Sequence, residues 1–258
     1  METAVPERTR IAGNADTGFL KVLALVFMFC DHAGKMLFPQ VPELRVLGRL
    51  AFPLYCWCLV VGCEYTRSVP KYLLRLLIIG VVSQPLYMIA LQHPWTDPNI
   101  ILTLAVGLLG LWALRERKWF SHLWGPPCAL ILAELLNVNY GWKGVLLILL
   151  LWAVRDSRKG IIAVMTAFCL FWGASSTALV TLMGQRLSPL TSVRPWSTLL
   201  SPWLRLQAMA ILALPLMTVP THTGLKLNKW VGYAIYPLHL LILWGLELAM
   251  GVSYGRLW

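Results

Sequence analysis

The stretch from Gly18 to Phe38, GFLKVLALVFMFCDHAGKMLF, restricts the fold of this chain more than any other feature. A membrane-spanning helix needs about 20 predominantly apolar residues, and this run has that length. Similar runs recur along the sequence, so that 58% of the 258 residues are hydrophobic and only 13% are charged. Soluble domains carry about 25% charged residues. The sequence therefore predicts an all-α, polytopic membrane helix bundle that forms a single domain.

The apolar runs predict about nine transmembrane helices, within a range of about 8 to 10. Residues 1–17 are expected to form a cytoplasmic N-terminal tail, and residues 18–258 the transmembrane domain. The long connection 184–202 contains three prolines and Trp196, which indicate a lid or a surface helix. The predicted helices cover residues 18–38, 46–65, 71–91, 99–114, 120–136, 142–154, 160–183, 203–219 and 230–250.

The basic residues set the expected orientation. They outnumber the acidic residues by 22 to 11, which gives a formal net charge of +11. They lie in short clusters between alternate apolar runs, as the positive-inside rule describes, so we expect a cytoplasmic N-terminus. A nucleic-acid-binding protein can have a similar charge balance, but this distribution argues against one. Membrane lipid is therefore an expected partner and nucleic acid is not.

The first predicted helix contains Lys21, Asp31, His32 and Lys35. Ionisable groups inside a spanning helix are costly, and they usually face a protein interior or a water-filled cavity. Lys21 and His32 are 11 residues apart. That spacing is about three helical turns and about 16 Å, so both side chains lie on one stripe of the helix. Asp31 points about 100° away from His32, so we expect it to pair with Lys35 or with a neighbouring helix.

Three other polar residues allow both a structural and a functional interpretation. Arg49 either extends to the lipid headgroups or binds an anionic or carbonyl-bearing substrate near His32. Asn99 is well placed to cap a helix. His239 follows Pro237 within the last run, where it could join two helices by a hydrogen bond, orient His32, bind an acceptor or act as a second acid.

Two polar clusters could contribute to a site. Arg67, Lys71, Tyr72 and Arg75 surround a turn on the predicted cytoplasmic side, where they either follow the charge topology or form a cradle for phosphate. The segment 137–144, NVNYGWKG, lies beside the short sixth run and could line a cavity.

No metal site is expected. The six cysteines lie in apolar runs, and neither they nor the histidines show the spacing of metal ligands. We expect His93, His122 and His222, which lie in loops or at helix ends, to be incidental to function.

Several motifs together resemble the TraX family. In order along the chain, from Lys21 to Trp244, they are KVLALVFMFCDHAG, GRLAFPLYCW, EYTRSVPKYLLRL, SQPLY, NIILTLAVGLL, NVNYGWKGVLLILL and YAIYPLHLLIL. DH, GRLAFP, YGWKG and YPLHL each lie in the expected helix. The family is similar to the wider group of transmembrane acyltransferases, whose first helix has a polar or basic residue, ten residues and then His. Lys21 and His32 match that pattern here.

The resemblance implies an acetyl-CoA-dependent acyltransferase of the bacterial cytoplasmic membrane, without a metal. It would transfer an acetyl group from acetyl-CoA to an amine or hydroxyl, with His32 as general base. The family's namesake acetylates the N-terminus of F-type conjugative pilin. The acceptor here stays open among a peptide N-terminus, a sugar, a lipid and a small amine.

The expected site residues fall into three groups. The catalytic group is His32, Asp31 and His239. The substrate-binding group is Lys21, Arg49, Asn99, Asn139, Tyr140 and Tyr236. The group expected to bind the phosphates of acetyl-CoA is Arg67, Lys71, Tyr72 and Arg75.

The sequence departs from the family pattern in two places. Many relatives have Asp where this chain has Asn139, and many have an Asn-Gly-Lys-type turn where this chain reads THTGLK at 221–226. The competing prediction is a proton-coupled membrane transporter with Asp31 and His32 as its relay. A non-catalytic membrane scaffold is the third.

Overall fold

The structure is a computed structural model that describes residues 11–176, 178, 180–182, 185–186 and 201–251. Apart from two short strands, its regular elements are helical. The elements are α1 (Thr17–Met36), α2 (Pro42–Gly48), α3 (Ala51–Tyr65), α4 (Val69–Leu91), α5 (Ile100–Glu116), η1 (Lys118–Phe120), α6 (Ser121–Leu135), α7 (Gly141–Ala153), α8 (Arg158–Ala174), β1 (Thr181–Leu182), β2 (Gln185–Arg186), η3 (Leu206–Ala213), α10 (Leu214–Thr218) and α11 (Lys229–Met250). The strands β1 and β2 pair antiparallel. Every predicted helix overlaps one of these helical elements.

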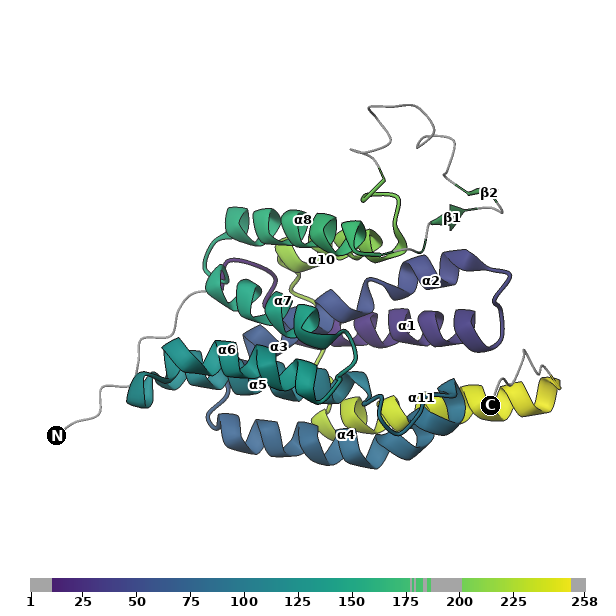
Figure 1. Ribbon diagram of the computed structural model, residues 1–258, viewed down its shortest axis with the longest axis horizontal. Coiled ribbons are helices and arrows are strands. Elements are labelled where there is room, and N and C mark those ends of the chain that lie inside the picture. Colours follow the sequence, from purple (N-terminus) through teal and green to yellow (C-terminus); the bar gives the residue numbers. More distant parts are fainter. Residues whose placement is uncertain (1–10, 177, 179, 183–184, 187–200, 252–258) are drawn as a thin grey trace.

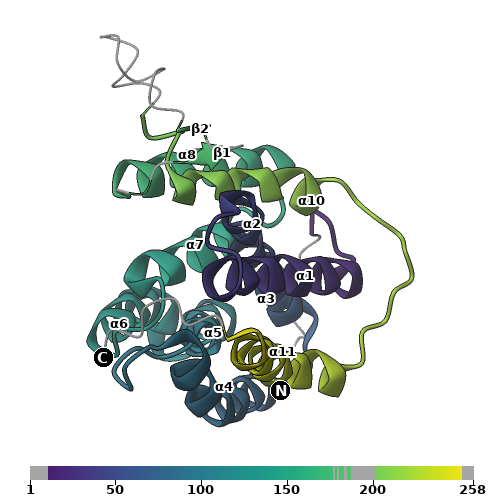
Figure 2. The ribbon, with the colours of Figure 1, turned by 90° about the vertical axis from the view of Figure 1, so that its right-hand side faces the viewer.

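The helices lie side by side around α3 (Figures 1 and 2). Helices α1, α5 and α7 pack against α3, while α11 packs against both α1 and α4. Helix α8 pairs with η3 and α10 on one side of the bundle, and α4, α5, α6 and α11 lie on the other. In the apolar window of Pro42–Tyr65, which contains α3, 83% of the residues are buried, whereas the corresponding windows of α1, α4 and α11 are 28%, 28% and 22% buried. Helix α3 is therefore the core of the bundle.

The outward faces of α4 and α11 are apolar. Their exposed side chains include Leu74, Ile78, Val81, Val82, Leu238, Leu241 and Ile242. Continuous apolar surface of this kind suits lipid rather than water. Within the described residues, four helices are long and apolar enough to cross a membrane: Thr17–Met36, Pro42–Tyr65, Val69–Leu91 and Trp230–Met250.

The predicted count of about nine spans is not confirmed. Helices α5, α6, α7 and α8 have 17, 15, 13 and 17 residues. All are shorter than the roughly 20 residues that cross a bilayer core without tilt or thinning.

The predicted helix 46–65 begins earlier and is broken. The chain is helical from Pro42, and the regular helix is interrupted at Arg49 and Leu50 before α3 begins. Pro53 explains the break, because it has no N–H to donate to the carbonyl of Arg49 and its ring crowds that carbonyl. The break leaves Arg49 at the junction of α2 and α3, facing α1.

The predicted helix 160–183 is too long. Helix α8 ends at Ala174 and is capped at Ser175, where the sequence GASS follows the apolar run. Glycine and serine are weak helix formers, which accounts for the early end. The predicted helix 203–219 is a 3₁₀ helix, η3, followed by the short α10. The lid predicted at 184–202 lies mostly outside the described residues.

The N-terminal segment and the connection before α11 are tied together. Residues 1–10 of the predicted tail lie outside the described residues, but residues 11–16 pack into the bundle. Asn14 is buried and its amide donates to Thr221 Oγ1 at 3.0 Å. Asp16 caps α1 by accepting from the Phe19 backbone N–H at 3.2 Å, and it also accepts from the Thr223 hydroxyl at 2.7 Å. These bonds fix the start of α11 beside the start of α1, as the loop in Figure 2 shows.

We expect Asp16→Ala to lower the free energy of unfolding by about 1 kcal/mol, because α1 loses its N-cap. The Thr223 hydrogen bonds lower the pKa of Asp16 in the folded protein. Its contribution is therefore present at neutral pH and lost as the pH falls through that pKa. Asp16→Asn, which keeps a capping oxygen, should be less destabilising. Thermal unfolding in detergent at several pH values measures both effects. An Asp16→Ala variant as stable as wild type at neutral pH would contradict this account.

Candidate functional site

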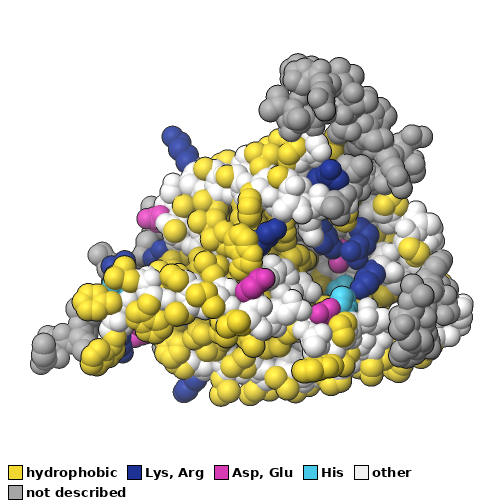
Figure 3. All heavy atoms as spheres, viewed as in Figure 1, with side chains coloured by type: hydrophobic (Ala, Val, Ile, Leu, Met, Phe, Trp, Pro, Cys, Tyr) yellow, Lys and Arg dark blue, Asp and Glu magenta, His cyan; other side chains and the backbone are white. Residues whose placement is uncertain are grey.

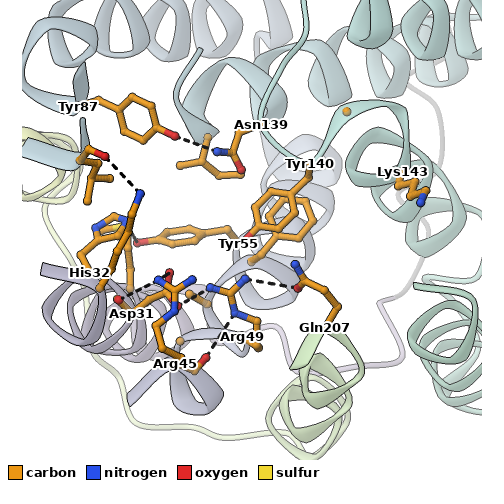
Figure 4. A pocket seen from close by; sticks show the side chains of 18 of the residues that line it. Asp31, His32, Arg45, Arg49, Tyr55, Tyr87, Asn139, Tyr140, Lys143 and Gln207 are labelled. Atoms are coloured by element: carbon orange, nitrogen blue, oxygen red, sulfur yellow. Dashed lines mark hydrogen bonds and ion pairs between the residues drawn. The ribbon is translucent and has the colours of Figure 1, made fainter. Parts of the chain in front are cut away.

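A cavity of about 590 Å³ opens between the helix ends near α2 and α7. Asp31, His32 and Lys35 reach it from α1, Tyr55 from α3, and Arg49 from the break after α2 (Figure 4). Its other polar residues are Arg45, Tyr87, His93, Glu134, Asn139, Tyr140, Lys143, Gln207 and Tyr236. Figure 3 shows basic side chains and a histidine gathered around the hollow. Of the residues predicted to bind substrate, Arg49, Asn139, Tyr140 and Tyr236 thus line one cavity with His32.

Asp31 forms an ion pair with the guanidinium of Arg49 and a weaker one with Arg45, whose Nη1 lies 3.5 Å from Oδ2. Asp31 therefore pairs with the neighbouring α2 region. Arg49 is only 7% exposed and also donates to Gln207 Oε1 at 3.4 Å, so it does not extend to the lipid headgroups. This cluster joins α1, α2 and η3 around the cavity wall.

The close approach of α2 to Asp31 depends on Gly48. A Cβ atom at Gly48 would collide with the side chain of Asp31. Three residues of the GRLAFP segment therefore have separate roles. Gly48 allows the close approach to α1, Arg49 supplies the charge that pairs with Asp31, and Pro53 breaks the helix.

His32 and His239 are hydrogen-bonded, with Nδ1 of His32 2.7 Å from Nε2 of His239 and the two ring planes 10° apart. The Nδ1 atom of His239 lies 3.1 Å from the Ile235 carbonyl, which can only accept. When the pair is neutral, His239 therefore carries its proton on Nδ1 and accepts at Nε2. His32 must then donate from Nδ1, and its Nε2 keeps an unprotonated lone pair.

The two histidines have different positions. His32 lines the cavity, whereas His239 is 4% exposed and is not among the lining residues. The sequence allows His239 to join two helices by a hydrogen bond, to orient His32, to bind the acceptor or to act as a second acid. Its bond to His32 joins α11 to α1 and places it to orient that ring, so we treat it as a positioning residue.

A second polar chain reaches the mouth of the cavity. Lys35 donates to the Leu91 carbonyl at 3.2 Å and lies 3.0 Å from Nε2 of His93. Because an ammonium only donates, His93 accepts there, and its Nδ1 lies 3.3 Å from Oδ2 of Asp97. Burial and then the Lys35 charge hold the pKa of His93 below its usual range, although Asp97 acts in the opposite direction. His93, which was expected to be incidental to function, therefore lies at the cavity and is bonded to two charged residues.

A second cavity of about 300 Å³ lies toward the opposite end of α1. It is mainly apolar, and Lys21, Tyr72, Arg75 and Tyr233 are among its lining residues. The Nε atom of Arg75 is buried without a hydrogen-bond partner among the described residues. Four residues, Met28, Tyr55, Ile100 and Tyr236, line both cavities. The cavities are therefore neighbours that share a wall, with His32 on one side and Lys21 on the other.

Three predicted site residues lie elsewhere. Asn99 is fully buried and lines neither cavity. It caps α5 by accepting from Ile101 N–H at 3.1 Å, and its amide donates to the Gly80 carbonyl at 2.7 Å, so its position is structural. Arg67 and Lys71 are exposed and also line neither cavity.

The sequence did not single out several lining residues, chiefly Arg45, Tyr55, Tyr87, Gln207 and Tyr233. Arg45 lies one helical turn before Arg49, a spacing that signals a shared face. Tyr87 is in the SQPLY motif, and its hydroxyl lies 3.0 Å from the Asn139 amide. Within the described residues, no cluster of three His, Cys, Asp or Glu side chains could hold a metal.

The fold and the cavities define a membrane helix-bundle protein with a hydrogen-bonded histidine pair beside an internal cavity. Residues 16–247 match the family described as TraX protein, and the chain belongs to that family.

Curated relatives match parts of the chain. It is 36% identical over 112 residues to the probable fimbrial assembly protein FimC, serogroup H1, of Dichelobacter nodosus, covering 38% of this chain and 46% of that protein. It is 32% identical over 140 residues to protein TraX of Escherichia coli strain K12, covering 50% of this chain and 52% of that protein. The chain thus spans about half the length of these relatives. No solved structure matches it.

We expect Gly48→Ala to destabilise the protein by about 1–3 kcal/mol, because the added methyl group overpacks the contact with Asp31 and separates it from Arg49. Gly245→Ala is the matched control, since nothing lies within 4 Å of its added Cβ. That helical control should be stabilising by about 0.5–1 kcal/mol. Thermal melting of both variants in detergent provides the comparison, and equal stability of the two would refute the packing argument.

Proposed function

We propose that this protein is an integral-membrane acyltransferase that transfers an acetyl group from acetyl-CoA to an amine or hydroxyl acceptor. The observation that carries the proposal is the lone pair on Nε2 of His32, which its hydrogen bond to His239 reserves beside a cavity. A neutral imidazole with one committed nitrogen and one free nitrogen is suited to general-base catalysis. The TraX family membership agrees with the acetyl-transfer chemistry that the sequence motifs imply.

The smaller cavity is the proposed binding site for the donor. Its apolar walls suit the pantetheine arm of acetyl-CoA, while Lys21 and Arg75 can bind the phosphates. Arg67 and Lys71, which lie on the nearby exposed turn, can contact the nucleotide end outside the cavity. The separation between Lys21 and His32 is about 16 Å along α1, so an extended arm is needed to bring the thioester to His32.

The larger cavity is the proposed acceptor site. Loops that the positive-inside rule places outside the cytoplasm surround it, so the acceptor would approach from the side opposite to the donor. We favour a peptide N-terminal amine as the acceptor, because one relative is named a probable fimbrial assembly protein. A pilus or fimbrial subunit would provide such an amine. Sugars, lipids and small amines are the other acceptors to test.

In the proposed reaction, the acceptor attacks the thioester carbonyl while Nε2 of His32 takes its proton. His239 then accepts a hydrogen bond from the Nδ1–H of the imidazolium and keeps the ring in position. General-base assistance of this kind contributes about 10²–10⁴-fold. Among the hydrogen bonds of the site, none joins Asp31 to a ring nitrogen of His32. Asp31 instead fixes α2 against α1 through its ion pair with Arg49.

The competing function is a proton-coupled transporter that uses Asp31 and His32 as a relay. The ion pairs with Arg45 and Arg49 disfavour it, because they occupy both carboxylate oxygens of Asp31, while His32 is bonded to His239 and not to Asp31. Transport therefore serves as the alternative outcome of the test below.

We expect His32→Ala to abolish acceptor-dependent release of free CoA from acetyl-CoA by the detergent-purified protein. The matched control is His122→Ala, because His122 lines neither cavity. It should keep wild-type turnover. His239→Ala should lower kcat with little change in the KM for acetyl-CoA, since the base remains but its tautomer is no longer fixed.

The wild-type protein with the acceptor panel, peptides with free N-terminal amines included, gives the decisive result. Calorimetry measures acetyl-CoA binding separately. Failure of the wild type to bind acetyl-CoA would reject the acyltransferase proposal. Proton-dependent uptake into vesicles that is lost in His32→Ala, without thioester cleavage, would favour the transporter.

A further inference from the structure

Tyr236 occupies the wall that the two cavities share. It extends from α11, one helical turn before His239, and its ring packs edge-on against the His239 ring with centroids 5.4 Å apart. Only 5% of the residue is exposed. The side chain therefore lies beside the histidine pair, in the wall between the proposed donor and acceptor sites.

The hydroxyl of Tyr236 is buried without a hydrogen-bond partner among the described residues. The backbone N–H of Ile100, at the start of α5, is near the same oxygen, but an N–H only donates, so the phenolic proton has no acceptor among the described residues. Its neighbours differ, because Tyr55 reaches Met28 Sδ at 4.0 Å and Tyr87 is bonded to Asn139. Burying a polar group without a partner is costly, and such groups in native structures often have a functional reason.

We infer that the Tyr236 hydroxyl donates a hydrogen bond to the carbonyl oxygen of the acyl thioester and stabilises the oxyanion that forms there. This inference rests on the proposed acyltransferase function and adds a catalytic residue to it. A thioester that enters from the Lys21 side meets the shared wall before it reaches His32. The carbonyl oxygen of an acetyl thioester gains negative charge as the acceptor attacks, and a fixed donor is most effective there.

The proposed acyl transfer consists of an addition to the thioester carbonyl followed by loss of the thiol. The acceptor nitrogen or oxygen forms a bond to the carbonyl carbon, its proton passes to Nε2 of His32, and the carbonyl π electrons move to oxygen, where Tyr236 donates. When the C=O bond re-forms, the C–S bond breaks. The sulfur leaves with the electron pair and takes the proton from His32 as free CoA thiol. Tyr236 keeps its own proton throughout.

The test uses acetyl-CoA labelled with ¹³C at the carbonyl, bound to the full-length protein in detergent. In wild type, hydrogen-bond donation weakens the C=O bond, so its infrared band should lie at lower wavenumber than in Tyr236→Phe. Tyr65→Phe is the control, because it makes the same change at a tyrosine that lines neither cavity. That control should leave the band unchanged.

Turnover and stability give two further readouts. Tyr236→Phe should lower kcat by about 10²–10³-fold, the loss typical for one oxyanion donor, while acetyl-CoA binding stays near wild type. Its melting temperature should equal or exceed that of wild type, because phenylalanine removes the unpaired polar group and keeps the ring. A lower melting temperature with unchanged kcat and an unchanged band would assign Tyr236 a structural role and overturn the inference. Failure of wild type to bind acetyl-CoA would instead reject the proposed function itself.

Discussion

One hydrogen bond between two neutral imidazoles organises the site. His32 and His239 are 207 residues apart in sequence, and their 2.7 Å contact requires α1 and α11 to be held in fixed register. The bonds of Asn14 and Asp16 to the loop before α11 provide that register at one end. Gly18 adds to it, because a Cβ atom there would collide with the Leu225 carbonyl. The contact between the first and last long helices therefore depends on packing at the start of α1, about 15 residues away from His32 along the helix.

The second constraint is charge within a membrane bundle. Asp31, Arg45 and Arg49 place a carboxylate between two guanidinium groups, with Arg49 almost fully buried. Desolvating these groups is expensive, and removing one partner leaves an uncompensated charge whose cost exceeds the value of the lost contact. Because Arg49 lies at the helix break that Pro53 produces, the backbone and the charge cluster depend on each other. The cluster closes the wall of the cavity next to His32 without using His32 itself.

The sequence predicted the helices well because apolar runs and caps are local signals. Asn99 caps α5 as expected, and His32, Arg49, Tyr140 and Tyr236 meet at one cavity. The incorrect predictions concern features that tertiary contacts determine. Pro53 breaks a helix whose composition looks continuous, and whether helices of 13 to 17 residues cross the bilayer depends on tilt and neighbours. The charges in a loop do not reveal which side chains point into the protein. The sequence therefore groups Arg67 and Lys71 with Arg75, although of these three only Arg75 lines a cavity.

The shared wall explains why a membrane bundle would suit the proposed acyl transfer. A thioester near an activated nucleophile is vulnerable to water, and a catalyst protects it by admitting donor and acceptor into a dry, closed junction. Here Met28 and Ile100 make the wall apolar, while Tyr55 and Tyr236 supply hydroxyl groups to it. In the proposed reaction, a donor and an acceptor that enter from opposite ends can meet only where the side chains of this wall move apart. The residue that both must pass is therefore better placed to act on the reacting carbonyl than any residue deeper in either cavity. That position, rather than the charge around the mouths, makes Tyr236 the natural complement to His32.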